Sequence, residues 1–138
     1  IRVGVIKDWD SRWFASKKDF SDNLGKKSKI ELANKSFETP GILTKAGVKV
    51  SIITDAPVIP LQYLPMCAGM AVKAGLDIEE AWKSITINPA TAIGIAGRVG
   101  SLEVGKDADV VIHNGNPLTD IDSSVATAII DGKIIYQE

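Results

Sequence analysis

The chain has 138 residues, 45% of them apolar, and its 16 basic side chains nearly balance 17 acidic ones. The formal charge of −1 provides no field that would collect nucleic acid or an anionic membrane, so neither is expected as a partner. The single cysteine, Cys67, excludes an intrachain disulfide, and its apolar surroundings indicate a buried, unreactive thiol. The single cysteine also suggests a cytoplasmic origin. No apolar run reaches the ~18 residues that span a bilayer and no signal peptide is visible, so we expect a soluble protein.

The first part of the chain carries few structural signals. Residues 1–6 are predicted to form a short strand, and residues 7–29 are polar with scattered aromatic side chains. Three lysines between positions 26 and 29 form a short cluster, which we interpret as a solvated loop rather than a phosphate site because the chain as a whole is neutral. Segment 1–30 is left without an assignment.

A helix followed directly by a strand is predicted next. Thr39 and Pro40 suit a helix start, because threonine can accept from a free N–H group and proline tolerates the first helical position. Gly47 is expected to end this helix. The nearly continuous apolar run 48–54 is typical of a buried parallel strand.

Asp55 is the most informative residue, because it follows this predicted strand at once. A carboxylate at the C-terminal end of a buried strand lies where α/β barrels keep their chemistry. Because Ala56 and Pro57 come next, the same residue could instead do no more than stabilise a turn.

Two helices are predicted after this turn. Residues 61–74 are apolar almost all round, which indicates burial on more than one side. Asp77 and Glu80 have the spacing of a capping box. In this motif the Asp77 side chain accepts from a free N–H group of the first helical turn, and the Glu80 side chain bonds back to the N–H group of Asp77. The helix that follows has one apolar face, made of Ile78, Ala81, Trp82 and Ile85.

The last part of the chain changes from helical to β patterns. An Asn-Pro pair at 88–89 starts one more short helix, which a glycine at position 94 or 97 ends. Short β runs follow at 108–113 and in a hairpin at 125–136, whose central Asp-Gly pair suits a tight turn.

Three sequence blocks occur here in a distinctive order: Asn-Pro-Ala from residue 88, Gly-Ser-Leu-Glu-Val-Gly-Lys-Asp-Ala-Asp from residue 100, and Asp-Gly-Lys from residue 131. In this order, residues 28–138 resemble the C-terminal end of the amidohydrolase superfamily, above all its imidazolonepropionase-like and prolidase-like branch. The resemblance implies an α/β fold, namely the terminal part of a metal-dependent (β/α)8 barrel followed by a small β-sandwich domain.

The resemblance also divides the chain. We expect an unassigned segment at 1–30, a barrel portion with the last strand and its flanking helices at 31–97, and a β-sandwich portion at 98–138. Because a complete (β/α)8 barrel takes about 250 residues, the chain is expected to be a piece of a larger enzyme.

Asp55 matches the family's aspartate at the end of the eighth barrel strand, which binds metal and carries a proton. The resemblance therefore implies that Asp55 is both a metal ligand and a catalytic residue. Many members have histidine after this aspartate, whereas this chain has Ala56. The family's other ligands lie on earlier strands, so a divalent metal, zinc in particular, is expected in the full-length enzyme and not stably bound to this chain alone.

Two further patterns resemble functional motifs without matching them. The run from Gly100 to Lys106 is nearly a phosphate-binding loop, but Asp107 replaces the hydroxyl residue and a strand follows instead of a helix. The single histidine, His113, is expected to be structural or to face solvent. Nucleophilic catalysis through Cys67 therefore has no base, and the acids near Asp77 suit helix capping better than pairing with Asp55.

Two functional hypotheses remain. The first is a C-terminal fragment of a metal-dependent amidohydrolase that acts on a non-peptide amide, cyclic amide or dipeptide bond of a small-molecule substrate and is inactive by itself. The second is a non-catalytic β-sandwich module for assembly. A lone barrel strand has unpaired edges, so self-association is expected in either case.

Overall fold

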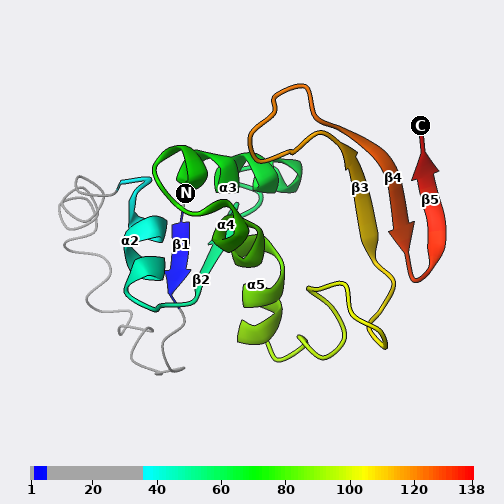
Figure 1. The fold of residues 1–138 in the computed structure, drawn as a ribbon, viewed down its shortest axis with the longest axis horizontal. Coiled ribbons are helices and arrows are strands. Elements are labelled where there is room, and N and C mark those ends of the chain that lie inside the picture. The colour runs from blue at the N-terminus through cyan, green and yellow to red at the C-terminus, as the bar shows by residue number, and fades with distance from the viewer. Residues whose placement is uncertain (1, 6–35) are drawn as a thin grey trace.

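The computed structural model describes residues 2–5 and 36–138. It contains a helical part with two short strands, beside which lies a separate three-stranded sheet (Figure 1). The elements in chain order are β1 (Arg2–Val5), α2 (Thr39–Lys45), β2 (Val50–Ile53), the 3-10 helix η2 (Leu61–Tyr63), α3 (Leu64–Lys73), α4 (Ile78–Ile85), α5 (Ile87–Ala92), β3 (Val110–Asn114), β4 (Ser124–Ile130) and β5 (Lys133–Gln137).

The strand predicted in the first six residues is present as β1. The polar segment 7–29 and its lysine cluster lie outside the described residues. Among residues 2–5 and 36–138, no helix combines the length and the apolar character that crossing a membrane requires.

Helix α2 begins and ends as its sequence predicts, with one correction at its start. The N-cap residue is Glu38 rather than Thr39, and no side chain caps the helix. Pro40 occupies the first turn, where its missing N–H group costs nothing. Gly47 follows the last turn with a φ of +80°, a conformation that glycine adopts without strain.

Strand β2 is the buried strand that the apolar run predicts, although it is shorter, covering Val50–Ile53. Val50 and Ile52 are 2% and 1% exposed. The expected parallel pairing is wrong for the described residues, because β2 pairs with β1 in antiparallel register, with Val5 opposite Val50. A continuous apolar run reports burial on both faces of a strand, and it carries no information on the direction of the neighbouring strand.

The core lies where α3 and α4 cover β2. Three small side chains of α3 are buried against the strand, namely Cys67, Ala68 and Ala71. Cys67 is therefore the buried thiol that its surroundings predict. The opposite side of α3 is exposed at Met66 and Met70. The described residues therefore bury one side of this helix and leave part of its apolar surface in contact with water.

Helix α4 confirms half of the predicted capping box. The Asp77 carboxylate accepts hydrogen bonds from the backbone N–H groups of Glu79 and Glu80, at 2.9 and 3.2 Å. The Glu80 carboxylate does not bond back and instead accepts from Lys83 at 2.7 Å. A flexible ammonium group on the same helix face is a better donor for it than a backbone amide. The predicted apolar face contacts the core, with Ala81 fully buried.

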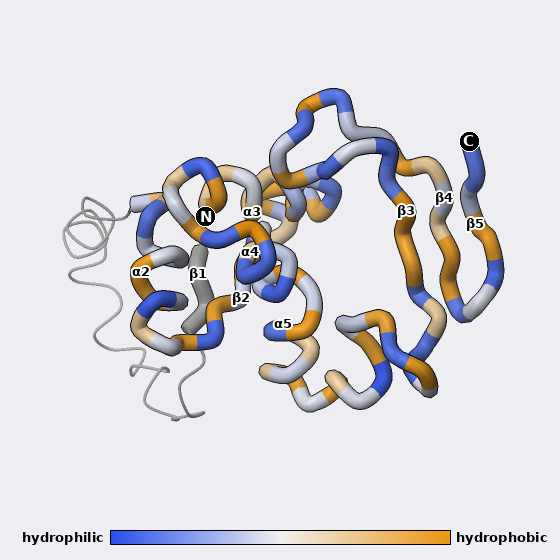
Figure 2. The backbone as a smooth tube through the Cα atoms, in the orientation of Figure 1, coloured by the Kyte–Doolittle hydropathy of each residue, from blue (hydrophilic) through white to orange (hydrophobic). Residues whose placement is uncertain are grey.

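Strands β3, β4 and β5 form one antiparallel sheet in that order. Asp131 and Gly132 have φ angles of +49° and +73°, as the tight turn predicted at this Asp-Gly pair requires. Apolar stretches run along all three strands (Figure 2). Every residue of β5 is exposed, and residues 98–138 contain this single sheet, so the predicted sandwich is not confirmed.

The sheet is joined to the helical part by the loop between β3 and β4. Leu118 of this loop is 6% exposed and belongs to the core cluster with the α3 residues. The backbone of Leu118 lies against Gly69 of α3 so closely that a Cβ atom on Gly69 would be 2.1 Å from the Leu118 carbonyl oxygen. A residue without a side chain is therefore required at position 69.

Substitution of Gly69 by alanine is expected to lower the free energy of unfolding by about 1–3 kcal/mol, because the loop must move away from α3. Urea unfolding measures this change. Gly97→Ala is the matched control, since a Cβ atom at Gly97 meets nothing within 4 Å, and its effect should stay within about 0.5 kcal/mol. Equal effects of the two substitutions would contradict the close contact.

Candidate active site at the end of strand β2

Asp55 lies two residues beyond the end of β2, as the first residue of a turn. Its carbonyl oxygen accepts a hydrogen bond from the backbone N–H group of Val58 at 3.0 Å, which closes the turn. The side chain is partly buried, and Thr54 before it is 4% exposed. The strand therefore places this carboxylate at its C-terminal end, as the sequence predicts.

The backbone of Asp55 is in the left-handed region, with a φ of +57°. Aspartate occupies this region more readily than most residues, but the conformation is still unfavourable relative to an extended one. Asp131 has a similar φ in the hairpin turn, so a positive φ by itself does not mark a functional residue. What distinguishes Asp55 is its position at the end of a buried strand.

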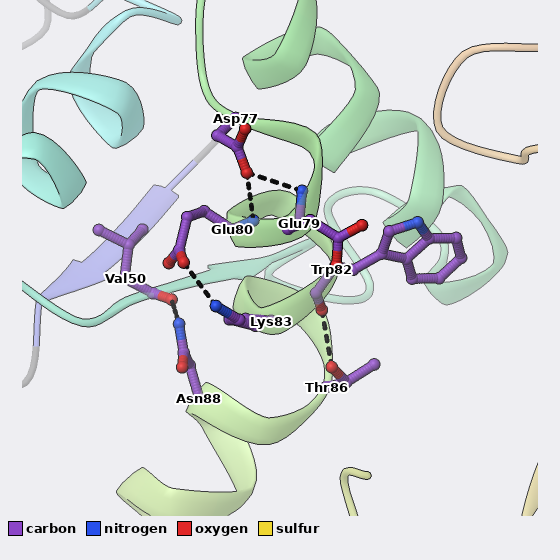
Figure 3. A network of polar contacts seen from close by, with 8 residues as sticks. All are labelled: Val50, Asp77, Glu79, Glu80, Trp82, Lys83, Thr86 and Asn88. Atoms are coloured by element: carbon purple, nitrogen blue, oxygen red, sulfur yellow. Dashed lines mark hydrogen bonds and ion pairs between the residues drawn. The ribbon is translucent and has the colours of Figure 1, made fainter. Parts of the chain in front are cut away.

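Helix α5 holds the beginning of β2 through a side-chain hydrogen bond. The side-chain amide of Asn88, in α5, donates a hydrogen bond to the carbonyl oxygen of Val50 at 2.9 Å (Figure 3). The helix begins at Ile87, so Asn88 does not start it as the sequence suggests. Its side chain instead joins α5 to the strand that leads to Asp55. Asn88 and Val50 are far apart in the sequence, so a local sequence pattern does not predict this contact.

A cleft of about 390 Å³ lies at the start of β2, at the opposite end of the strand from Asp55. Glu80 and Lys83 line it together with Lys49. The hydrogen bond from Lys83 to Glu80 (Figure 3), assisted by the attraction of their charges, raises the pKa of the Lys83 ammonium group. Glu80 therefore faces the wrong end of β2 to form a carboxylate pair with Asp55.

The described residues bring together no group of three His, Cys, Asp or Glu side chains that could hold a metal ion. Cys67 is in the core under β2, whereas His113 is on β3 beside the irregularity in its pairing with β4. The thiol and the imidazole thus belong to different parts of the fold. Asp55 is the candidate functional carboxylate.

The run from Gly100 to Lys106 forms a loop whose side chains bond to one another. The Lys106 ammonium group bonds to Ser101 and, at 3.2 Å, to Glu103. The Ser101 hydroxyl and then the Lys106 charge hold the pKa of the Glu103 carboxyl below its usual range. Gly100 and Gly105 both have a φ of +94°, a conformation that turns require. The ammonium group of Lys106 is bonded to side chains of the same loop.

A model of the Amidohydrolase family matches residues 15–135. This match covers most of the chain and includes β2, Asp55 and most of the C-terminal sheet. The chain belongs to this family, and its relatives place it in the imidazolonepropionase-like and prolidase-like branch.

Three similar proteins illustrate the relationship. The imidazolonepropionase of Maricaulis maris is 36% identical over 96 residues, which are 67% of this chain and 24% of that protein. A solved amidohydrolase from Thermotoga maritima superposes with a TM-score of 0.74 at 39% identity, over 80% of this chain and 29% of the other. A solved Xaa-Pro dipeptidase with bound methionine in the active site gives a TM-score of 0.62 at 30% identity, over 74% and 25%. The chain therefore spans about a quarter of the length of these relatives.

A shorter stretch is similar to another class of protein. The small ribosomal subunit protein uS3 of Finegoldia magna is 52% identical over 64 residues, which are 41% of this chain and 26% of that protein. The uS3 protein of Clostridium botulinum is similar over 62% of the chain, whereas the amidohydrolase match extends over residues 15–135. The longer match and the superposition over 80% of the chain decide the family.

Substitution of Asn88 by alanine is expected to lower the free energy of unfolding by about 1–3 kcal/mol, because the carbonyl of the buried Val50 loses its side-chain donor. Thermal or urea unfolding measures this. Asn114→Ala is the control, since the exposed Asn114 amide bonds to Ser124 and Glu138 on the surface. A cost for Asn114→Ala as large as that for Asn88→Ala would show that the contact with β2 has no special role.

Proposed function

We propose that the chain is the C-terminal portion of an enzyme that hydrolyses a carbon-nitrogen bond of a small-molecule substrate. The observation that carries the proposal is the position of Asp55 at the C-terminal end of β2, in a chain that belongs to the amidohydrolase family. The names of the similar proteins, imidazolonepropionase and Xaa-Pro dipeptidase, favour a cyclic amide, another non-peptide amide or a dipeptide as the bond that is cleaved.

In this proposal Asp55 moves a proton. Hydrolysis adds hydroxide to the acyl carbon and a proton to the leaving nitrogen. A carboxylate beside the reacting bond can take the proton from the attacking water and pass it to the nitrogen. The hydrogen bond from the Val58 N–H group to the Asp55 carbonyl oxygen holds the backbone of this turn before substrate arrives, and preorganisation of this kind makes a catalytic group effective.

The family resemblance also implies a divalent metal, zinc in particular, with Asp55 as one of its ligands. A metal centre needs several donors in a fixed geometry, and the described residues provide Asp55 without two further donors beside it. The described residues by themselves therefore do not fit a metal centre. We propose that the remaining donors lie outside the described residues and that the isolated chain is inactive.

A non-catalytic assembly role is the second candidate function. The observation that favours it is the apolar surface of the C-terminal sheet, where Ile134 and Ile135 of β5 are both more than half exposed. The near-neutral charge still argues against nucleic acid or a membrane surface as a partner. A cytoplasmic location, which the single cysteine suggests, stays a prediction.

Asp55→Asn in the full-length gene product is expected to lower kcat/KM for amide hydrolysis by about 10²–10⁴-fold, because the amide cannot carry the proton. Asp131→Asn is the matched control, since Asp131 also has a positive φ but lies in the hairpin turn, and it should leave kcat/KM unchanged. Full activity of the Asp55→Asn enzyme would overturn the proposed role.

The isolated chain should hold much less than one metal ion per molecule after dialysis, as elemental analysis measures. Close to one zinc per chain, lost in Asp55→Ala, would show that the chain holds a complete centre of its own. Metal bound by the full-length product and not by the chain is the expected pattern.

We also propose that the isolated chain self-associates. In the described residues, β3 and β5 are each paired along one edge only, and open strand edges with exposed apolar side chains favour association. Light scattering should show species heavier than the 14.7 kDa of one chain. A single species of that mass over a wide range of concentration would contradict this expectation.

A further inference from the structure

Asn114 is the last residue of β3, and Gly115 follows it directly. It is the one asparagine in the sequence that precedes glycine, whereas Asn88 and Asn116 both precede proline. The side-chain carbonyl carbon of an asparagine can be attacked by the backbone nitrogen of the next residue. Glycine leaves this nitrogen unhindered, and in proline the nitrogen carries no hydrogen that could be removed. Residue 114 therefore has the asparagine side chain most prone to this reaction.

The structure holds the Asn114 side chain and backbone only weakly. The side-chain amide donates to the Glu138 carboxylate at 3.2 Å and to the Ser124 hydroxyl at 3.5 Å, which are long distances for hydrogen bonds. Asn114 and Ser124 also form the last pair of the β3–β4 ladder. The end of a ladder opens at a lower free energy than its centre, so the backbone of Asn114 can leave the extended conformation, as the attack requires.

The Asp-Gly pair at the turn between β4 and β5 provides a comparison within the same sheet. The N–H group of Gly132 donates to the carbonyl oxygen of Ala108 at 3.0 Å, and the N–H group of Asp131 donates to the Asp109 carboxylate at 2.8 Å. An N–H group that donates a hydrogen bond gives up its proton less easily. We therefore expect the corresponding reaction at Asp131 to be slower than at Asn114.

We propose that Asn114 is a site of spontaneous deamidation. The backbone nitrogen of Gly115 forms a bond to Cγ of Asn114 and loses its proton, while the bond from Cγ to Nδ2 breaks and the side-chain nitrogen leaves with a proton as ammonia. Water then opens the cyclic imide at either carbonyl carbon. The products are aspartate and isoaspartate, in which the main chain passes through Cγ. Water is the co-reactant, and the catalytic role of Asp55 is not required.

The new carboxylate at position 114 faces the partner of the lost amide. The Asn114 amide donates to Glu138, whereas a carboxylate cannot donate, and two negative charges at this separation repel each other. Isoaspartate also adds a methylene group to the main chain where β3 meets the loop that carries Leu118. Deamidation therefore loosens the end of the β3–β4 ladder.

Incubation of the full-length gene product at mildly alkaline pH tests the modification, because base removes the proton of the Gly115 amide. Mass analysis of proteolytic peptides should find aspartate and isoaspartate at position 114 and no conversion of Asn88 or Asn116. Asn114→Gln is the matched control, since glutamine keeps the amide but must close a larger ring, and residue 114 of this variant should stay unconverted. Intact Asn114 after a time that converts a short Asn-Gly peptide completely would overturn the proposal.

Amide hydrogen exchange tests the consequence for the sheet. Asn114→Asp reproduces the aspartate product, and exchange at the paired ends of β3 and β4 should be several-fold faster in this variant than in Asn114→Gln. Adding Glu138→Gln to Asn114→Asp removes the repulsion and should restore slow exchange. Equal exchange in Asn114→Asp and in the unmodified protein would overturn the loosening of the ladder.

Discussion

The burial of β2 is the constraint on which the rest of the structure depends. Val50 and Ile52 are almost completely removed from water by α3 and α4, and this burial is the main source of stability in such a core. The buried carbonyl of Val50 must then find a donor, which Asn88 provides. The beginning of the strand that leads to Asp55 is thereby held in place.

The C-terminal sheet is linked to the same core by a close contact of the loop between β3 and β4. Leu118 inserts into the cluster that α3 forms over β2, and Gly69 makes room for its backbone. The loop around Leu118 is shaped by its own polar groups, since Asp120 accepts from the N–H group of Asn116 at 2.8 Å. That bond is also the main reason why the pKa of Asp120 is lowered. Packing of this loop thus attaches the sheet to the helices.

The small number of metal-binding side chains among the described residues limits the chemistry that the site can perform. One carboxylate can move a proton, but it cannot hold a divalent metal firmly without other ligands. The C-terminal sheet also has large apolar residues in contact with water, among them Ile134 and Ile135, which is the kind of surface that other protein commonly covers. Both observations agree with a chain that spans about a quarter of its relatives' length.

The sequence by itself determined the features that depend on neighbouring residues: the start of α2 near Pro40, the cap at Asp77, the hairpin turn at Asp131 and the place of Asp55 after an apolar run. Each is settled by interactions within a few positions, so a local pattern is sufficient to predict it. Only the tertiary structure decided that β2 pairs with β1 in antiparallel register, that Asn88 bonds to Val50, and that Leu118 requires a glycine at position 69. These contacts join residues far apart in the chain, and their partners are chosen by which surfaces the core brings together.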